Sequence, residues 1–232
     1  MKTKWQTLLN PKRFRKHTTG RKLYDERNEF ENDYTRIILS PHFRRLQDKT
    51  QVFPYDDTDF VRTRLTHSLE VSSFARSLGL SVEKKLIEDK KLSQELSGHI
   101  PSILATAGLI HDIGNPPFGH FGEECIQKYF ETIPGGFPEA MSEEQKKDFL
   151  KFEGNAQTFR ILRKLGPSHD QFSYNLTFPV LSSIIKYPYS SKDGNRSDDN
   201  KISKKKFHRS HLILYFNWCS AVVQDVPKGI LN

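Results

Sequence analysis

The chain has 232 residues, of which 35% are hydrophobic and 28% charged; this composition excludes a disordered chain and predicts one domain or slightly more. A formal net charge of +8 favours polyanionic partners such as nucleotides, nucleic acid or an anionic membrane, although a basic surface also serves solubility alone. Two cysteines exclude a disulfide framework, and no apolar run reaches the ~18 residues of a spanning helix. The N-terminus lacks the apolar core of a signal peptide, so we expect a cytoplasmic protein.

The first part of the chain predicts a polar arm followed by helices. Residues 1–30 are basic and polar, with a short helix at most. Helical spacing begins at Glu31, and after an acidic loop at 56–59 a long helix is expected from about residue 63 to 93. The apolar residues of this long helix fall near helical spacing with polar residues between them: Leu65, Leu69, Phe74, Leu78 and Leu86.

The middle of the chain predicts a buried helix and then shorter ones. Residues 101–114, PSILATAGLIHDIG, are apolar nearly all round, which is typical of a central helix. Two prolines then force a turn, and a further helix is expected over 119–132. A helical pattern resumes near 143 and continues to about 166, and residues 173–187 favour helix over strand. The sequence therefore predicts a mostly α protein.

The segment most informative for chemistry is HDIGNPPFGHFGE, residues 111–123. His111 and Asp112 stand together at the end of the apolar helix, where buried ionisable groups need partners or a metal. An imidazole nitrogen beside a carboxylate oxygen can bind a divalent cation if another helix supplies a further ligand.

A second pair in this segment suits proton transfer. His120 and Glu123 are three residues apart on the next helix, so they share one face and should border the same cavity as the HD pair. A histidine and a carboxylate there can orient a water molecule or donate a proton to a leaving oxygen. The alternative is structural, with Glu123 capping the helix and His120 lying on the surface.

Upstream, RTRLTHSLE at residues 62–70 carries a third histidine and two arginines. His67 lies between apolar positions, a pattern that suits a buried core histidine as well as a metal ligand. Arg62 and Arg64 precede it, and a guanidinium can contact a phosphate through two hydrogen bonds. The alternative for both arginines is a solvated helix face.

Five motifs, in order, closely resemble the deoxyguanosine triphosphate triphosphohydrolases of the HD-domain superfamily: RRLQDKTQVF, RTRLTHSLEV, HDIGNPPFGHFGEE, KFEGNAQTFRIL and NLTFPVLSSIIKYP. The resemblance runs from about residue 5 to residue 206. It implies an all-α HD-domain helical bundle, divided into an N-terminal arm over 1–30, a core over 31–208 and an atypical tail over 209–232.

The resemblance also implies a function: metal-dependent hydrolysis of a deoxynucleoside triphosphate (dNTP) to the deoxynucleoside and inorganic triphosphate, in a homo-oligomer. The metal ligands would be His67, His111 and Asp112, holding Mg²⁺ or Mn²⁺, with Fe²⁺ or Zn²⁺ also compatible. His120 and Glu123 match the catalytic histidine and carboxylate. The positions that match nucleotide-binding residues are Gln51, Arg64, Asn115, Lys186 and Tyr187.

One departure from the family pattern leaves alternatives open. Relatives carry a fourth ligand, an aspartate well beyond the KYP motif, whereas the last aspartate here, Asp225, comes too early and in surroundings that do not match. We therefore expect an HD domain that is incomplete at its C-terminus. One alternative is an inactive remnant that at most binds metal or nucleotide. Another is an HD phosphohydrolase acting on nucleotide monophosphates or cyclic nucleotides, although the extended motifs argue against it. No nucleic-acid-binding motif is visible, so nucleic acid would be an additional partner.

Overall fold

The computed structural model describes residues 4–15, 25–49, 62–166 and 172–186, and every regular element in these ranges is helical, which confirms the predicted all-α class. In chain order the helices are α1 (Lys4–Leu8), α2 (Glu29–Ile38), α3 (Pro41–Arg44), α4 (Arg64–Glu88), α5 (His99–Ile110), α6 (Gly119–Glu131), α7 (Glu143–Leu150), α8 (Gly154–Arg163) and α9 (Phe178–Ser183), with short 3-10 turns η1 (Arg45–Asp48) and η2 (Gln94–Leu96). None of the helices in these ranges combines the length and the apolar character needed to cross a membrane.

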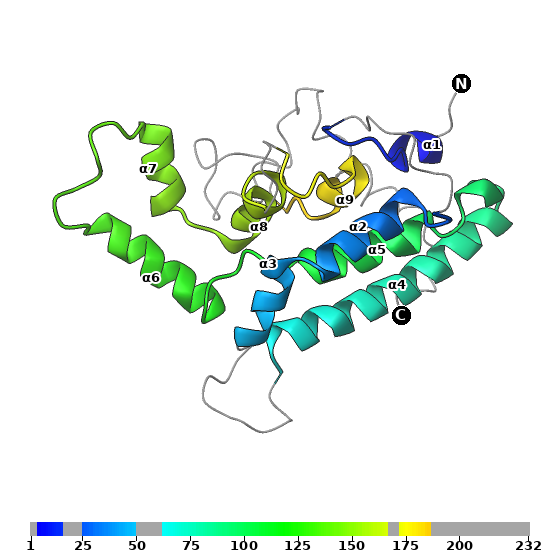
Figure 1. Ribbon diagram of the computed structural model, residues 1–232, viewed down its shortest axis with the longest axis horizontal. Helices are drawn as coiled ribbons and strands as arrows, with labels where there is room; N and C mark the ends of the chain where they lie inside the picture. The colour runs from blue at the N-terminus through cyan, green and yellow to red at the C-terminus, as the bar shows by residue number, and fades with distance from the viewer. Residues whose placement is uncertain (1–3, 16–24, 50–61, 167–171, 187–232) are drawn as a thin grey trace.

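The long helix α4 packs against α5, and α2 lies along another side of α5 (Figure 1). Two glycines allow the α4 and α5 backbones to approach closely. A Cβ atom on Gly79 would lie 2.7 Å from the Cα of Pro101, and one on Gly108 would lie 2.6 Å from the Cα of Ser72. These contact pairs run in opposite directions along the two helices, so the packing is antiparallel. The first turn of α4 therefore lies beside the last turn of α5.

The predicted long helix is present, although it ends at Glu88 and not near residue 93, and three of its large apolar residues do not pack into the core. Leu69, Phe74 and Leu78 are 37%, 74% and 48% exposed. The buried residues of α4 are instead mostly small or charged: Arg64, Ser68, Ser72, Gly79, Val82, Glu83 and Leu86. The reason is steric, because two backbones in such close contact leave no room for large side chains between them.

The hydrophobic core is centred on α5 and α2, whose buried residues include Ile100, Ile103, Leu109, Phe30 and Ile37. The predicted N-terminal arm also contributes to this core. Trp5, Leu8 and Leu9 are buried in the same cluster, because the short helix α1 turns its apolar side inward. The domain boundaries at residues 30 and 208 stay predictions.

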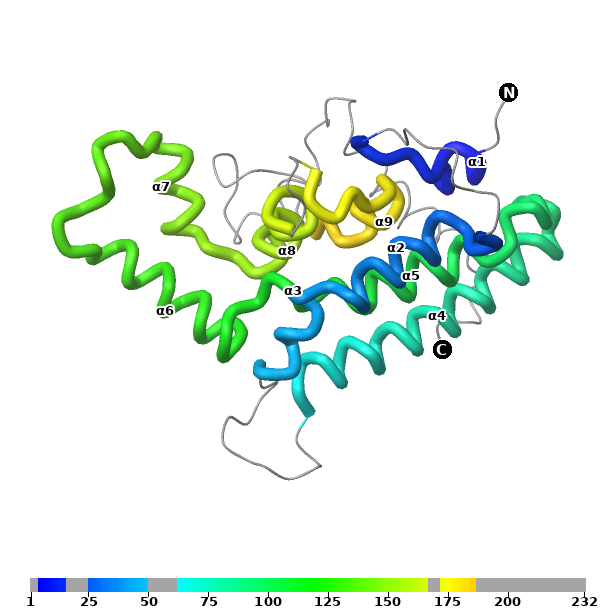
Figure 2. The backbone as a smooth tube through the Cα atoms, viewed as in Figure 1, coloured from blue at the N-terminus to red at the C-terminus, as the bar shows by residue number. Residues whose placement is uncertain are grey.

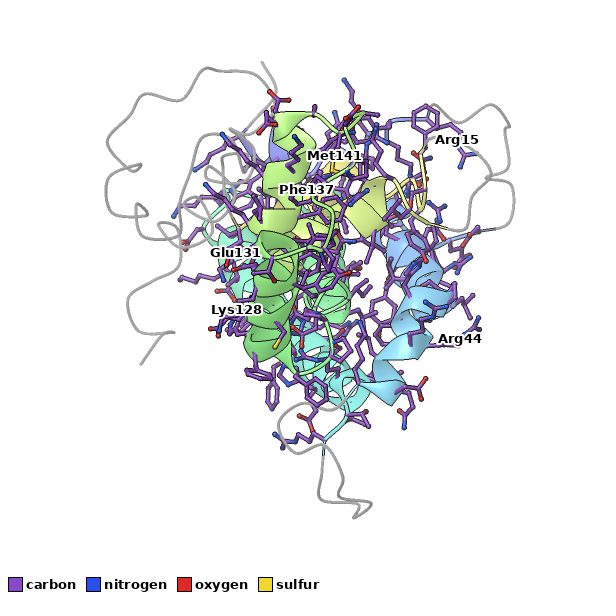
Figure 3. All side chains as sticks on the ribbon, turned by 90° about the vertical axis from the view of Figure 1, so that its left-hand side faces the viewer. Arg15, Arg44, Lys128, Glu131, Phe137 and Met141 are labelled. Atoms are coloured by element: carbon purple, nitrogen blue, oxygen red, sulfur yellow. The ribbon has the colours of Figure 1, made fainter. Side chains whose placement is uncertain are left out.

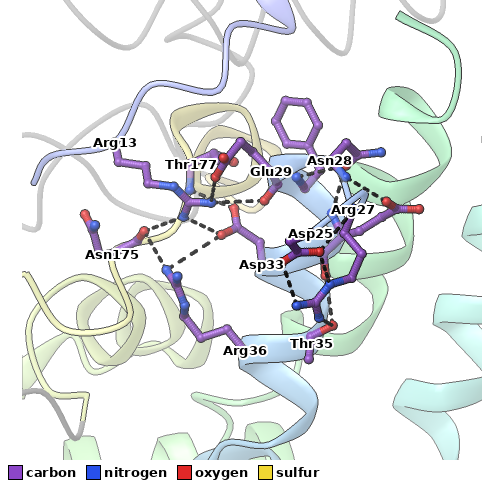
Figure 4. A network of polar contacts seen from close by, with 12 residues as sticks. Arg13, Asp25, Arg27, Asn28, Glu29, Asp33, Thr35, Arg36, Asn175 and Thr177 are labelled. Carbon is purple, nitrogen blue, oxygen red and sulfur yellow. Dashed lines mark hydrogen bonds and ion pairs between the residues drawn. The ribbon is translucent and has the colours of Figure 1, made fainter. Parts of the chain in front are cut away.

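A buried ion-pair network ties the N-terminal segment to the rest of the bundle (Figure 4). Arg13 donates to Asp33 Oδ1 on α2 at 2.5 Å and to the main-chain oxygen of Asn175 at 2.6 Å. It also pairs with Glu29 Oε2 at 2.9 Å. The other carboxylate oxygen of Asp33 accepts from the amide of Thr177 at 2.8 Å. Three segments far apart in the sequence are thereby joined just before α9.

Helices α6 and α7 form a hairpin that extends away from the α2–α4–α5 layer (Figure 2). Phe130 packs on Phe149 and Phe137, with ring centroids 4.6 and 5.8 Å apart. Figure 3 looks onto this hairpin, with Phe137 in the connecting loop. The single helix expected from about 143 to 166 is wrong, because residues 151–153 separate α7 from α8. The side chain of Glu153 caps α8 by accepting from its third amide, and a cap of this kind starts a new helix.

Candidate metal centre

Three candidate ligands meet where the start of α4 faces the end of α5. His67 lies in the first turn of α4, and His111 and Asp112 directly follow α5. One ligand atom from each lies within 4.8 Å of the other two. Atoms bound to one cation at ~2.1 Å can be at most ~4.2 Å apart, so small side-chain adjustments would let all three share an ion. Two imidazoles and a carboxylate fit a divalent metal, and the antiparallel packing of the helices brings them together.

The two histidines are in a state suited to coordination. Their rings meet edge to face with centroids 5.3 Å apart. Partial burial, and then the neighbouring His111, lower the pKa of His67 from its ordinary value of 6.5, which favours the neutral form that binds metals. His111 Nδ1 lies 2.8 Å from the main-chain oxygen of Gly108. Donation of the Nδ1 proton to that oxygen leaves Nε2 to coordinate.

Asp112 is held by a donor on each carboxylate oxygen. Arg64 Nη1 donates to Oδ2 at 2.8 Å, and Asn115 Nδ2 donates to Oδ1 at 2.6 Å. Both partners of the Arg64–Asp112 ion pair are buried, with exposed fractions of 5% and 7%. Arg64 Nε and Ser68 Oγ are also buried and have no hydrogen-bond partner among the described residues. The site therefore contains polar groups that the described protein atoms do not satisfy.

His120 and Glu123 form a hydrogen-bonded pair at the start of α6. His120 Nδ1 donates to Glu123 Oε2 at 2.9 Å, while the amide of Gly154 donates to Glu123 Oε1 at 2.8 Å. The histidine side chain is 74% exposed and the carboxylate is buried. The structural alternative expected His120 on the surface, and the exposed side chain agrees with that part of it. Glu123, however, accepts from the first residue of α8, whereas a capping role would have tied it to its own helix.

Gly154 connects this pair to the metal ligands. A Cβ atom there would lie 2.1 Å from Asn115 Oδ1 and 2.9 Å from Glu123 Oε1. Only a residue without a side chain fits between them. Because Asn115 also donates to Asp112, the His120–Glu123 pair borders the same site as the predicted ligands.

A cavity of ≈ 400 Å³ opens beside His111, between α4, α5, α8 and the end of α9. The other residues that line it are mostly apolar or uncharged: Val71, Ala75, Leu104, Ala107, Gly108, Asn155, Thr158, Ser183, Ile184 and Lys186. Lys186, a predicted nucleotide-binding residue, therefore shares the cavity with a predicted metal ligand. Gln51 and Tyr187, predicted for the same role, lie outside the described residues.

Sequence reasoning missed three residues that support the site. Lys49 Nζ donates to the main-chain oxygen of Asn115 at 2.8 Å. The amide of Gly114 donates to Thr158 Oγ1 at 2.9 Å, which anchors the turn after the HD pair on α8. The third is Gly154. Lys49 stands in the RRLQDK motif, while Gly154 and Thr158 stand in the FEGNAQT motif; these motifs were the only available signal, because nothing local marks a long-range contact.

The fold and this site define an HD-domain protein. The family model described as the HD domain matches residues 64–171, which contain all three predicted metal ligands and the His120–Glu123 pair. The chain therefore contains an HD domain over these residues.

The names of the relatives that the chain matches specify an activity. A protein of Listeria innocua named deoxyguanosinetriphosphate triphosphohydrolase-like protein is 50% identical over 215 residues, covering 88% of this chain and 45% of the relative. A protein of the same name from Synechocystis is 45% identical over 190 residues, covering 81% and 43%. The deoxyguanosinetriphosphate triphosphohydrolase of Klebsiella pneumoniae is 40% identical over 187 residues, covering 68% and 36%. The chain thus spans less than half the length of the curated relatives that it matches.

Proposed function

We propose that this protein hydrolyses deoxynucleoside triphosphates to the deoxynucleoside and inorganic triphosphate, with the help of a divalent cation held by His67, His111 and Asp112. The observation that carries the proposal is the convergence of these side chains within 4.8 Å of one another, in a chain similar to proteins named for this activity. Bound there, Mg²⁺ or Mn²⁺ would polarise the α-phosphate and lower the pKa of a coordinated water.

The positive side chains around the site supply the binding chemistry for a polyanion. Arg64 carries a buried Nε donor without a partner among the described residues, and Lys186 lines the adjoining cavity. A triphosphate chain can form charge-assisted hydrogen bonds with positively charged side chains of this kind. The largely apolar wall made by α4 and α5 suits the uncharged part of a nucleotide, in keeping with the usual lining of ligand cavities.

The His120–Glu123 pair suits the proton transfer that this hydrolysis requires. Water attacks the α-phosphorus, the bond from phosphorus to the 5′-oxygen breaks, and that oxygen must receive a proton. With Nδ1 bonded to Glu123, the exposed imidazole of His120 can present Nε2 to the substrate. The buried carboxylate fixes the orientation of the ring, as in other acid–base pairs.

The test is product analysis with the full chain. Each dNTP is incubated with Mg²⁺ or Mn²⁺, and deoxynucleoside and inorganic triphosphate are measured in equal amounts. Asp112→Asn should abolish the activity, because it removes a charged ligand. The matched control is Asp89→Asn just beyond the far end of α4, where the carboxylate pairs with Lys85 and Lys91 on the surface, and it should leave turnover unchanged.

Other outcomes would contradict the proposal in identifiable ways. Release of orthophosphate or pyrophosphate would show that a different phosphorus–oxygen bond is cleaved. Hydrolysis of nucleotide monophosphates or cyclic nucleotides would show a different HD phosphohydrolase activity. Nucleotide binding without turnover, in a folded and metal-loaded sample, would support the inactive remnant.

A further inference from the structure

Four hydrogen bonds form a closed ring around the carboxylate of Asp112. Lys49 Nζ donates to the main-chain oxygen of Asn115 at 2.8 Å, and Asn115 Nδ2 donates to Asp112 Oδ1 at 2.6 Å. Arg64 Nη1 donates to Asp112 Oδ2 at 2.8 Å. The ring closes at the main chain, where the amide of Arg64 donates to the oxygen of Lys49 at 2.9 Å.

The ring joins three segments that are far apart in the sequence: the residue after η1, the first residue of α4 and the turn after α5. Lys49 contributes twice, through its main-chain oxygen to α4 and through its ammonium to the turn. Removing the ammonium opens the ring between the turn and the residue after η1. Asn115 would then lose the contact that holds its main-chain oxygen, while its side chain still has to orient Asp112.

We propose that Lys49 is a positioning residue of the metal centre, which holds Asn115 and the start of α4 so that Asp112 faces His67 and His111. Lys49 acts through Asn115, to whose main-chain oxygen its ammonium donates. This role rests on the proposed metal-dependent function, and it assigns to the RRLQDK motif a task within that site.

A lysine suits this position physically. Its chain is long enough to cross from the residue after η1 to the turn, and its charge strengthens the hydrogen bond to a carbonyl oxygen. Partial burial, followed by the charge of Arg64, lowers the pKa of Lys49, so its ammonium has given up part of its hydration. An apolar side chain of similar length would fill the space but leave the oxygen of Asn115 without this donor.

The experiment measures Mn²⁺ binding alone, by calorimetric titration of the metal-free full chain. Lys49→Met should bind Mn²⁺ roughly tenfold to a hundredfold more weakly, the loss typical when a residue that orients a metal ligand is removed. Lys49→Arg, which keeps a charged donor, should recover most of the affinity. The control is Lys84→Met on the exposed face of α4, which should bind as the wild type does.

The thermal unfolding midpoint of the metal-free variants distinguishes a positioning role of Lys49 from a purely structural one. We expect Lys49→Met to melt close to Lys84→Met while differing from it in Mn²⁺ affinity. If Lys49→Met does not fold, Lys49→Gln, which keeps a neutral donor, is measured in the same way and should also bind more weakly. Wild-type Mn²⁺ affinity in the folded Lys49 variant would overturn the positioning role. Unchanged affinity in Asp112→Ala would instead overturn the metal centre, and with it the proposed function.

Discussion

Arg64 on the first turn of α4 donates to Asp112 Oδ2 at 2.8 Å, and both side chains are buried. An arginine predicted to bind phosphate thus already pairs with a predicted metal ligand. In the proposed enzyme this guanidinium has two tasks: Nη1 orients the carboxylate, and its other nitrogens can meet the substrate.

Replacing Arg64 with alanine should therefore weaken nucleotide binding substantially. A hydrogen bond to a charged group contributes about 1.5–3 kcal/mol, which corresponds to roughly tenfold to more than a hundredfold in affinity. The measurement is titration with a non-hydrolysable dNTP analogue. Arg76→Ala, at an exposed position farther along α4, is the control. Equal losses of affinity in both variants would show that the effect comes from the overall positive charge and not from a contact made by Arg64.

Substitution of Glu123 should lower kcat more than it changes KM. Glu123→Gln keeps the shape of the side chain but removes the carboxylate that orients His120, and positioned acid–base groups contribute typically 10²–10⁴-fold. Steady-state kinetics of dNTP hydrolysis would measure this. Glu124→Gln, the exposed neighbour on α6, should behave as the wild type. Equal kcat values for the two variants would remove Glu123 from the proposed proton transfer.

The imidazole of His67 should titrate below pH 6.5 in the metal-free protein. Burial lowers the pKa of the folded form, so the unfolded chain takes up the proton first as pH falls. His67 therefore stays neutral and able to coordinate just below pH 6.5, and its contribution to stability declines on the acid side of that value. Nuclear magnetic resonance of the ring nitrogens, assigned with His67→Gln, measures the midpoint. A midpoint at or above 6.5 would contradict the prediction.

Loss of Arg13 should destabilise the fold. Arg13→Ala removes the closest charged partner of the fully buried Asp33 and leaves Arg36 at 3.9 Å, and breaking a buried pair costs up to about 3–5 kcal/mol of the free energy of unfolding. Urea denaturation of the full chain measures the loss. Arg27→Ala breaks an exposed pair with Asp25 and should change the stability little. A result in which the two variants are equally stable would show that the buried network does not hold the N-terminal segment in place.

The periodicity and the breakers of this sequence were enough to predict the all-α class and several helices. The helix expected over 119–132 is α6 (Gly119–Glu131), and the one expected over 63–93 contains α4 (Arg64–Glu88). These predictions succeeded because helix formation follows local spacing, and because prolines and glycines interrupt it locally. The order of the motifs was enough to name the three residues that the structure brings together as candidate ligands.

The tertiary structure alone decided what surrounds those residues. Local spacing did not predict that Leu69 and Phe74 of α4 would be exposed, because glycines on α4 and α5 set how closely the two helices approach. It also did not predict that Lys49 closes a ring around Asp112, because one link of that ring is a main-chain hydrogen bond and another is made to a main-chain oxygen. Every residue carries the same main-chain groups, so such contacts leave no mark on the sequence, and they arise only when folding brings distant segments together.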